Sequence, residues 1–274
     1  SSGSDANDGF TTATPWKHAP GDANATGKAA AATVKPGESV LFKGGVPYYG
    51  HISVPTSGSA SGGYITYATA SGWGSGQAIL DGTGYDSGYN MNLMNGILID
   101  GKSYVKVQNL TIQNYTANHS LSGLWWGGGG VSISNSSSVE VSGCLIQKMD
   151  DYLTNPNAPN GSGIGVSTNS SNIKIFNNEV TKIGHTGIYI GESSNIEVYG
   201  NNIHSYIVWG MDIVANQGPL ANIDVHDNNI HDLIEYEGYQ PHMDYIIIRD
   251  HQDAPDVKGM SNILATLSIM GCVT

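Results

Sequence analysis

The chain has 274 residues, a formal net charge of −12 and only 12% charged residues, about half the share found in an ordinary globular protein. Nucleic acids and anionic membranes select basic protein faces, so this acidity argues against both as partners. No apolar stretch approaches the roughly 20 residues of a membrane-spanning helix, which argues against membrane insertion.

Residues 1–95 are the first region of the chain. In two segments, 39–54 and 63–82, apolar residues alternate with polar ones and glycines mark the corners. Alternation with a period of two predicts strands. We therefore expect an N-terminal segment followed by the first, irregular coils of a solenoid.

Residues 96–231 repeat one nine-residue pattern. Short strands that return every 23 to 34 residues, with no segment that reads as a helix, predict stacked coils. The fold class is therefore all-β, a right-handed parallel β-helix in a single domain. The copies are YVKVQNLTI (104–112), SVEVSGCLI (138–146), NIKIFNNEV (172–180), NIEVYGNNI (195–203) and NIDVHDNNI (222–230), and a second alternating segment recurs at 96–100, 130–134, 163–167, 187–191 and 210–214.

An asparagine recurs at one corner of the last three copies, as Asn178, Asn201 and Asn228. The backbone often turns at such a corner through the left-handed region, which asparagine tolerates. An inward amide finds partners only in the neighbouring coils, so we expect a ladder of stacked asparagines. Cys144 occupies the same column one coil earlier, and we expect a small buried residue there rather than half of a disulfide.

Two columns of outward residues are also ordered. Opposite charges that face each other on neighbouring strands stabilise a sheet by a few tenths of a kcal/mol each, so we expect cross-strand ion pairs in the first column. In the second column we favour an aromatic stack over a sugar-binding platform. The first column holds Lys106, Glu140, Lys174, Glu197 and Asp224, and the second holds Phe176, Tyr199 and His226.

Residues 232–274 are expected to form a long loop, a last coil and a C-terminal cap. The segment 244–250 reads as one more strand, and 259–274 is apolar enough for a cap or a final coil. The open end of a β-helix exposes strand edges, which allows end-to-end assembly. The oligomeric state itself stays open.

The N-terminal segment resembles the start of secreted right-handed β-helix proteins of the pectate-lyase-like and polysaccharide-lyase-like superfamily. The matching residues are Pro36, Gly37, Glu38, Val40, Gly44 and Gly45, and the resemblance covers about the first 55 residues and the repeats to 231. It implies an extracellular or cell-surface protein that acts on carbohydrate. The Lys and Arg set of the lyase base motifs is missing. The polygalacturonase pattern is faintly echoed by Asp150-Asp151, Gly184-His185-Thr186-Gly187 and Ile248-Arg249-Asp250.

The lengths of the loops predict a cleft. Segments 113–129, 147–162 and 231–244 are long, whereas 181–186 and 204–209 are short. Loops from the same corner of successive coils emerge on the same side, so the long loops would form walls on either side of a low floor. We expect a polysaccharide or another glycan to bind in this cleft, between 147–162 and 231–244.

The residues expected in this cleft suit carbohydrate chemistry, because aromatic rings stack on sugar faces while carboxylates and imidazoles transfer protons. Asp151 and His185 hold equivalent positions in adjacent coils, so the carboxylate would favour and orient an imidazolium. The candidate catalytic residues are Asp151, His185, Lys182 and Glu235, and the candidate substrate-binding residues are Trp125, Trp126, Trp209, His204, His231 and Tyr236.

The sequence leaves the reaction open, although it favours an enzyme. A glycoside hydrolase would place Asp151 and either Glu235 or Asp232 on opposite sides of the scissile bond. A lyase would use Lys182 or His185 as the base, with Ca²⁺ held by Asp150 and Asp151 to neutralise a uronate carboxylate. The alternative is a non-catalytic extracellular protein that binds glycans, acts as an adhesin or forms filaments.

Overall fold

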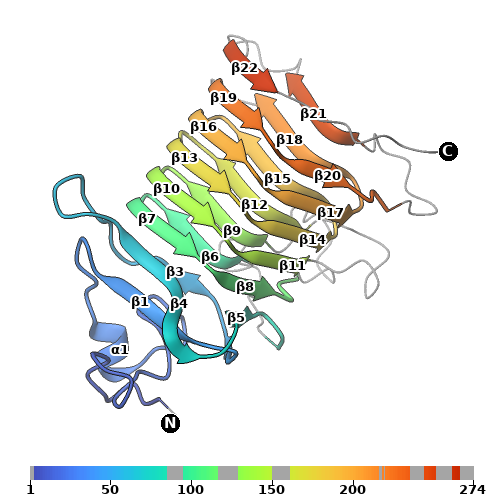
Figure 1. Cartoon of the computed structure of the whole chain (residues 1–274). Coiled ribbons are helices and arrows are strands. Elements are labelled where there is room, and N and C mark those ends of the chain that lie inside the picture. Colours follow the sequence, from blue (N-terminus) through green and yellow to red (C-terminus); the bar gives the residue numbers. More distant parts are fainter. Residues whose placement is uncertain are drawn as a thin grey trace, which may run out of the picture.

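The computed structural model describes residues 3–84, 95–116, 129–149, 161–215, 218, 220–234 and 244–249, and the backbone of 250 and 261–265. Its strands stack into a solenoid with three parallel sheets, one along each face (Figure 1). Each coil crosses the three sheets in turn and then pairs with the next coil. This architecture confirms the predicted parallel β-helix.

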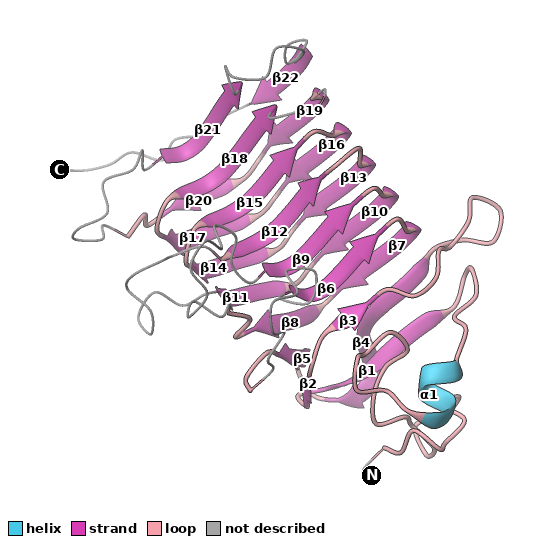
Figure 2. Ribbon diagram, turned by 180° about the vertical axis from the view of Figure 1, so that it is seen from behind, coloured by secondary structure: helices cyan, strands magenta, loops and turns pink. Residues whose placement is uncertain are grey.

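The strands alternate in chain order between three sheets, which we name A, B and C. Figure 2 shows the same stack from behind, with the helix α1 (Gly27–Ala31) at the N-terminal end. Sheet A holds β3 (Ile52–Ser53), β6 (Asn95–Asp100), β9 (Gly129–Ser134), β12 (Ser162–Ser167), β15 (Thr186–Gly191), β18 (Trp209–Ala215) and β21 (Asp244–Asp250). Sheet B holds β1 (Ser39–Gly44), β4 (Ile65–Gly74), β7 (Ser103–Gln108), β10 (Ser137–Ser142), β13 (Ser171–Phe176), β16 (Ser194–Tyr199), β19 (Ala221–His226) and β22 (Ser261–Ala265). Sheet C holds β2 (Pro47–Tyr49), β5 (Ala78–Asp81), β8 (Leu110–Gln113), β11 (Leu145–Met149), β14 (Glu179–Ile183), β17 (Asn202–Tyr206) and β20 (Asn229–His231).

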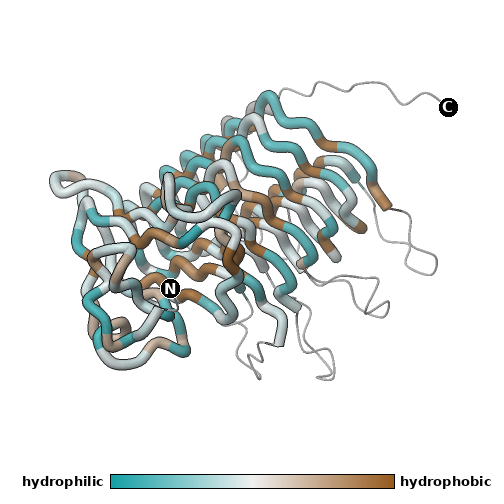
Figure 3. Tube along the Cα trace, turned by 60° about the horizontal axis from the view of Figure 1, so that its bottom comes forward, coloured by the Kyte–Doolittle hydropathy of each residue, from teal (hydrophilic) through white to brown (hydrophobic). Residues whose placement is uncertain are grey.

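Each nonapeptide spans two strands rather than one. In the copy 172–180 the chain leaves β13 on sheet B, turns and enters β14 on sheet C. The pairing register sets Ile173 opposite Ile196 and Ile196 opposite Ile223, so the apolar columns of the repeat coincide in space. These side chains point inward and form one continuous core along the axis. Figure 3 shows the resulting alternation of hydropathy along the coils.

The asparagine ladder is present at the corner between sheets B and C. Asn178 donates from Nδ2 to Oδ1 of Asn201 over 3.0 Å, and Asn201 donates in the same way to Asn228 over 2.9 Å. The left-handed backbone was predicted at the ladder residues but falls one residue earlier, where Asn177 has φ 53° and Gly200 has φ 65°. The residue before each ladder asparagine makes the left-handed turn. The asparagine that follows can therefore point its amide into the core.

Glycine occupies a column at the corner between sheets C and A. A Cβ atom at Gly163 would lie 2.4 Å from the carbonyl oxygen of Gly187 and 2.5 Å from Cγ1 of Val180. Gly187 and Gly210 meet their neighbours in the same way. A side chain at these positions would push successive coils apart. Glycine therefore allows the first residues of β12, β15 and β18 to approach one another closely.

The predicted outward columns are confirmed. Lys106 pairs with Glu140 at 2.8 Å, and Lys174 pairs with Glu197 at 2.6 Å. The rings of Phe176, Tyr199 and His226 lie face to face, with centroids 5.0 and 5.2 Å apart. Each ring covers the face of the next, so the column presents ring edges to solvent and favours a structural role over a sugar platform.

The predicted burial of Cys144 is also confirmed. Its side chain is buried as a free cysteine in the core, and burial raises the pKa of its thiol to about 12. The backbone N–H of Cys144 donates to Oδ1 of Asn178, which extends the ladder by one coil. Cys272, the other cysteine of the sequence, lies outside the described residues.

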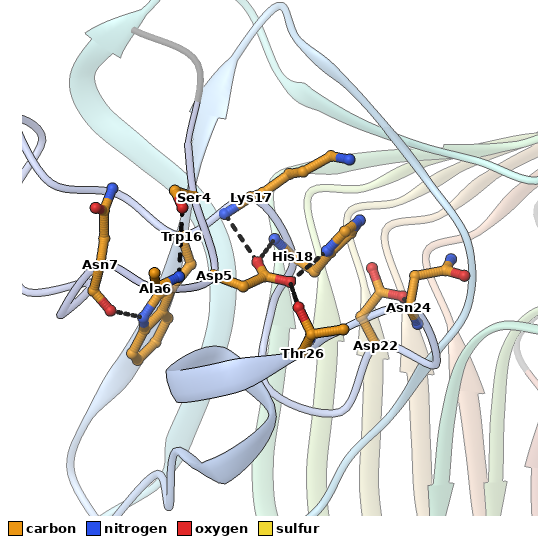
Figure 4. A network of polar contacts seen from close by, with 10 residues as sticks. All are labelled: Ser4, Asp5, Ala6, Asn7, Trp16, Lys17, His18, Asp22, Asn24 and Thr26. Atoms are coloured by element: carbon orange, nitrogen blue, oxygen red, sulfur yellow. Dashed lines mark hydrogen bonds and ion pairs between the residues drawn. The ribbon is translucent and has the colours of Figure 1, made fainter.

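The N-terminal segment packs against the first coils around Asp5, which is buried (Figure 4). Its carboxylate accepts hydrogen bonds from the backbone N–H groups of Lys17, His18 and Thr26, and Oδ2 lies 2.7 Å from Nδ1 of His18. These hydrogen bonds hold the pKa of Asp5 well below its usual range, although burial alone would raise it. The five-residue helix α1 follows this network and was not predicted, because one turn is too short to show a period. No described helix is long and apolar enough to span a membrane.

Replacing Asn201 by Leu should lower the free energy of unfolding by about 1–3 kcal/mol, because the amide of Asn178 and the carbonyl groups around Asn201 lose their partners inside the protein. Chemical denaturation monitored by circular dichroism measures this loss. Asn202→Leu is the matched control, because this neighbouring side chain lies on the outer face of β17. Equal losses in the two variants would contradict the structural role of the ladder.

Candidate functional site

The two short turns that were predicted as the floor of the cleft are present. Gly184 and His185 join β14 to β15, and Ile207 and Val208 join β17 to β18. The candidate residues of the longer loops lie outside the described residues. These are Trp125, Trp126, Asp150, Asp151, Glu235 and Tyr236.

The described candidates fall into two groups on different sheets. Lys182, His204 and His231 lie on sheet C, with Lys182 exposed on β14. The rings of His204 and His231 stack with centroids 5.1 Å apart, which confirms that they share a column. His185 and Trp209 instead lie where strands of sheet A begin.

A polar cluster extends from this second group over the outer face of sheet A. We name His185, Tyr189, Trp209, Asp212 and Arg249 the sheet A cluster. The strands β15, β18 and β21 place Tyr189 beside Asp212 and bring Arg249 to the same face. The His185 ring meets the Trp209 ring edge to face at 4.8 Å, and the guanidinium carbon of Arg249 lies 4.6 Å from the centroid of the Trp209 ring.

A buried ion pair fixes the centre of the cluster. Asp212 is 1% exposed, and Arg249 donates to both of its oxygens, from Nε over 3.0 Å and from Nη2 over 2.7 Å. Such a fork holds a guanidinium more rigidly than a single contact holds an ammonium group. The hydrogen bonds to Asp212 raise the pKa of Arg249, so the cation persists despite partial burial. Arg249 is the only arginine in the sequence.

His185 is neutral at neutral pH in this environment. Burial lowers the pKa of its imidazole to about 4, and the positive charge of Arg249 acts in the same direction. Nδ1 lies 2.7 Å from Oγ1 of Thr186, which orients the ring. The sequence predicted an imidazolium favoured by Asp151, whereas the described surroundings of His185 disfavour the charged form.

Two buried donors adjoin the cluster. The indole Nε1 of Trp209 and the phenol oxygen of Tyr206 have no hydrogen-bond partner among the described residues. A buried polar group without a partner costs about 1–3 kcal/mol, and such groups occur at sites that trade stability for function. They lie at the corner where the chain enters β18.

The sequence predicted part of this cluster. His185 and Trp209 were assigned to the floor, and Arg249 was noted only within a faint motif. Tyr189 and Asp212 were missed, because both lie within strands that were recognised by their apolar alternation. A usable signal was present: Asp212 is an acidic residue between Met211 and Ile213, and the single arginine follows in the next strand of the same sheet.

The described residues offer no ready metal centre. Within this part of the chain, no group of three or more His, Cys, Asp or Glu side chains is arranged to hold a metal ion. Asp150 and Asp151, the expected calcium ligands, lie outside the described residues.

The pKa of His185 predicts how stability depends on pH. The unfolded chain binds a proton on this imidazole below about pH 6.5, whereas the folded chain does so only below about pH 4. The free energy of unfolding should therefore fall as the pH falls between these values, by at most about 1.4 kcal/mol per pH unit. Denaturation across this range should show a shallower slope in His185→Gln than in the unchanged protein. Identical slopes would contradict a partly buried, neutral His185.

Comparison with known proteins places this geometry in a family. The family model described as the right-handed beta helix region matches residues 89–236. No curated protein matches the chain in sequence.

Similar solved structures include three carbohydrate-active enzymes. An alginate lyase from Paenibacillus sp. str. FPU-7 is 18% identical, with 74% of this chain and 71% of that one covered and a TM-score of 0.49. The GH136 lacto-N-biosidase from Eubacterium ramulus is 13% identical, with 96% and 66% covered and a TM-score of 0.49. The pectate lyase Pel9A is 13% identical, with 94% and 76% covered and a TM-score of 0.47.

These similarities carry no argument for an activity. The family match covers more than half of the chain. It agrees with the three parallel sheets, in which strands of successive coils stack on one another. The chain therefore belongs to the right-handed β-helix family.

Proposed function

We propose that the sheet A cluster binds and cleaves an acidic polysaccharide. The observation that carries this proposal is the forked pair of Arg249 and Asp212 on the outer face of sheet A, with Trp209 and His185 beside it. A rigid cation, an aromatic ring and an imidazole together supply what a charged sugar needs for recognition and proton transfer.

Arg249 gives the site its preference for an anion. Asp212 accepts hydrogen bonds from Nε and Nη2 of Arg249. The remaining N–H groups of the guanidinium are left to donate to a substrate carboxylate. The Arg249 side chain is 32% exposed, so a ligand can reach it. In a chain of net charge −12, a fixed guanidinium offsets the general repulsion of a polyanion.

Among cleavage reactions, the described residues favour β-elimination. The base removes the proton on the carbon next to the uronate carboxyl group, that electron pair forms the new carbon–carbon double bond, and the glycosidic oxygen leaves and takes up a proton. Arg249 stabilises the negative charge that develops on the carboxyl group. The neutral imidazole of His185 and the phenol of Tyr189 are the candidates for the two proton transfers.

Hydrolysis is the alternative cleavage reaction. It needs two carboxyl groups across the scissile bond, about 5 to 9.5 Å apart. Asp212 is engaged with Arg249, so the pair would be Asp151 with Glu235 or Asp232, the carboxylates that the sequence offers. We retain Ca²⁺ at Asp150 and Asp151, and an extracellular location, as proposals.

The proposal predicts that the protein releases unsaturated products from uronate polysaccharides. Incubation with uronate and neutral polysaccharides, followed by assays for ultraviolet absorbance and for new reducing ends, measures this. Reducing ends without absorbance would indicate hydrolysis. Binding without either product would support the non-catalytic alternative, a glycan-binding or adhesive protein.

On a substrate found in this way, Arg249→Gln and His185→Ala should each lower kcat/KM at least about 10²-fold. Trp209→Ala should mainly raise KM through the lost ring contact. Lys174→Gln is the charge-matched control for Arg249→Gln, because Lys174 lies on sheet B. Full activity of both His185→Ala and Arg249→Gln would contradict the site.

Further variants test the predicted site residues that lie outside the sheet A cluster. Asp151→Asn tests the carboxylate predicted to act with His185. Lys182→Ala, His204→Ala and His231→Ala test whether the adjacent residues of sheet C contact the substrate.

If Ca²⁺ bridges the substrate to Asp150 and Asp151, a chelator should lower both activity and melting temperature, and added Ca²⁺ should restore them. The measurement is a thermal melt beside the product assay, with and without chelator. Unchanged values in both would remove calcium from the mechanism.

A further inference from the structure

A cleft lies at the end of the solenoid opposite the sheet A cluster. This cleft of about 750 Å³ opens between the N-terminal segment and the first coil, within the range of about 300–1,000 Å³ typical of small-molecule sites. We name it the N-terminal cleft. Its lining comes from residues 8–12, 15–19 and 32–35, from β1 and from the segment 70–73. Figure 1 shows this end far along the axis from β21, which carries Arg249.

The N-terminal cleft is built on fixed contacts. Nε1 of Trp16 donates to the carbonyl oxygen of Asn7 over 2.8 Å, and Gly9 packs so closely on the indole that a Cβ atom there would lie 2.3 Å from it. Phe42 and Tyr48 meet edge to face at 5.1 Å, and Lys43 N–H donates to the Tyr48 hydroxyl. The walls are thus formed before any ligand arrives, which lowers the cost of ordering on binding.

Apolar and aromatic side chains are exposed in this cleft. Phe10 is 86% exposed and Leu41 is 53% exposed. Trp16, Trp73 and Tyr48 line the same space and are partly exposed. Exposed large apolar groups gathered in a concave site mark a binding surface rather than ordinary surface composition.

The charge of the cleft is opposite to that of the chain. Three exposed lysines, Lys17, Lys28 and Lys35, line it. Among the described residues, no carboxylate forms an ion pair with them. The three lysines outnumber the two carboxylates of the lining, Asp8 and Glu38, which accept hydrogen bonds from Oγ1 of Thr14 over 2.6 Å and from the backbone N–H of Lys35 over 2.8 Å.

We propose that the N-terminal cleft binds a short stretch of an acidic glycan without cleaving it. The aromatic rings would stack on the apolar faces of the sugars, and the lysines would contact carboxylate or sulfate groups. The choice of a glycan over another anion rests on the proposed function. A second binding site on the same rigid rod holds a long polymer at two points and so raises its effective concentration at the sheet A cluster.

Calorimetric titration of the full chain tests this inference. The protein carries Arg249→Gln, so that the sheet A cluster is impaired, and the probes are short oligouronates, sulfated oligosaccharides and neutral oligosaccharides of matched length. The acidic probes should bind, and more weakly at high salt, whereas the neutral ones should bind at least about tenfold more weakly.

Substitutions in the same background assign the binding to the cleft. The triple variant Lys17→Gln, Lys28→Gln and Lys35→Gln should lose at least about tenfold in affinity, and Trp73→Ala should also weaken binding. Lys102→Gln, Lys106→Gln and Lys174→Gln together make the same change of charge outside the cleft and should leave the affinity unchanged.

Equal affinities of the two triple variants would overturn the inference. Equal binding of an oligoglutamate peptide would overturn the assignment to a glycan. If no acidic probe binds but the unchanged protein cleaves a uronate polysaccharide, this inference fails and the proposed function stands. If the acidic probes bind but the unchanged protein cleaves nothing, the proposed function fails alone.

Discussion

Every coil must hydrogen-bond to the next at the spacing of paired strands, about 4.8 Å, and the rest of the structure depends on this constraint. Parallel pairing in constant register turns each position of the repeat into a column, so one residue type must suit several neighbouring coils at once. Apolar columns fill the interior. The corners are harder to build, because the chain must turn there without leaving polar groups unpaired or forcing the coils apart.

Two corners meet this requirement in different ways. Between sheets B and C, the amides of Asn178, Asn201 and Asn228 bond one another inside the protein. Between sheets C and A, Gly163 and Gly187 bring the backbones together where any side chain would collide with the next coil. The second corner leads directly into the sheet A cluster, so the same close packing that holds the coils also fixes the positions of His185 and Trp209.

The repeat made the fold predictable, since periodic columns in a sequence become columns in space. The ladder, the stack of Phe176 with Tyr199 and the burial of Cys144 followed from the repeat alone. The site was less predictable, because the repeat does not fix the residue type at its outward positions. Asp212 and Tyr189 occupy such positions between apolar neighbours, and only the register shows that Asp212 meets Arg249 from a different coil. The left-handed turns were misplaced by one residue, because composition marks a corner without showing which residue turns.

In the proposed mechanism, Arg249 is the group that receives the substrate. The most direct measurement is the crystal structure of His185→Ala in complex with an acidic oligosaccharide that the unchanged protein cleaves. We predict a sugar carboxylate within hydrogen-bond distance of the Arg249 guanidinium, while Asp212 keeps its own bonds to that group and Trp209 lies beside the sugar ring. A ligand held over sheet C at His204 and His231, with no contact to Arg249, would contradict this role of Arg249.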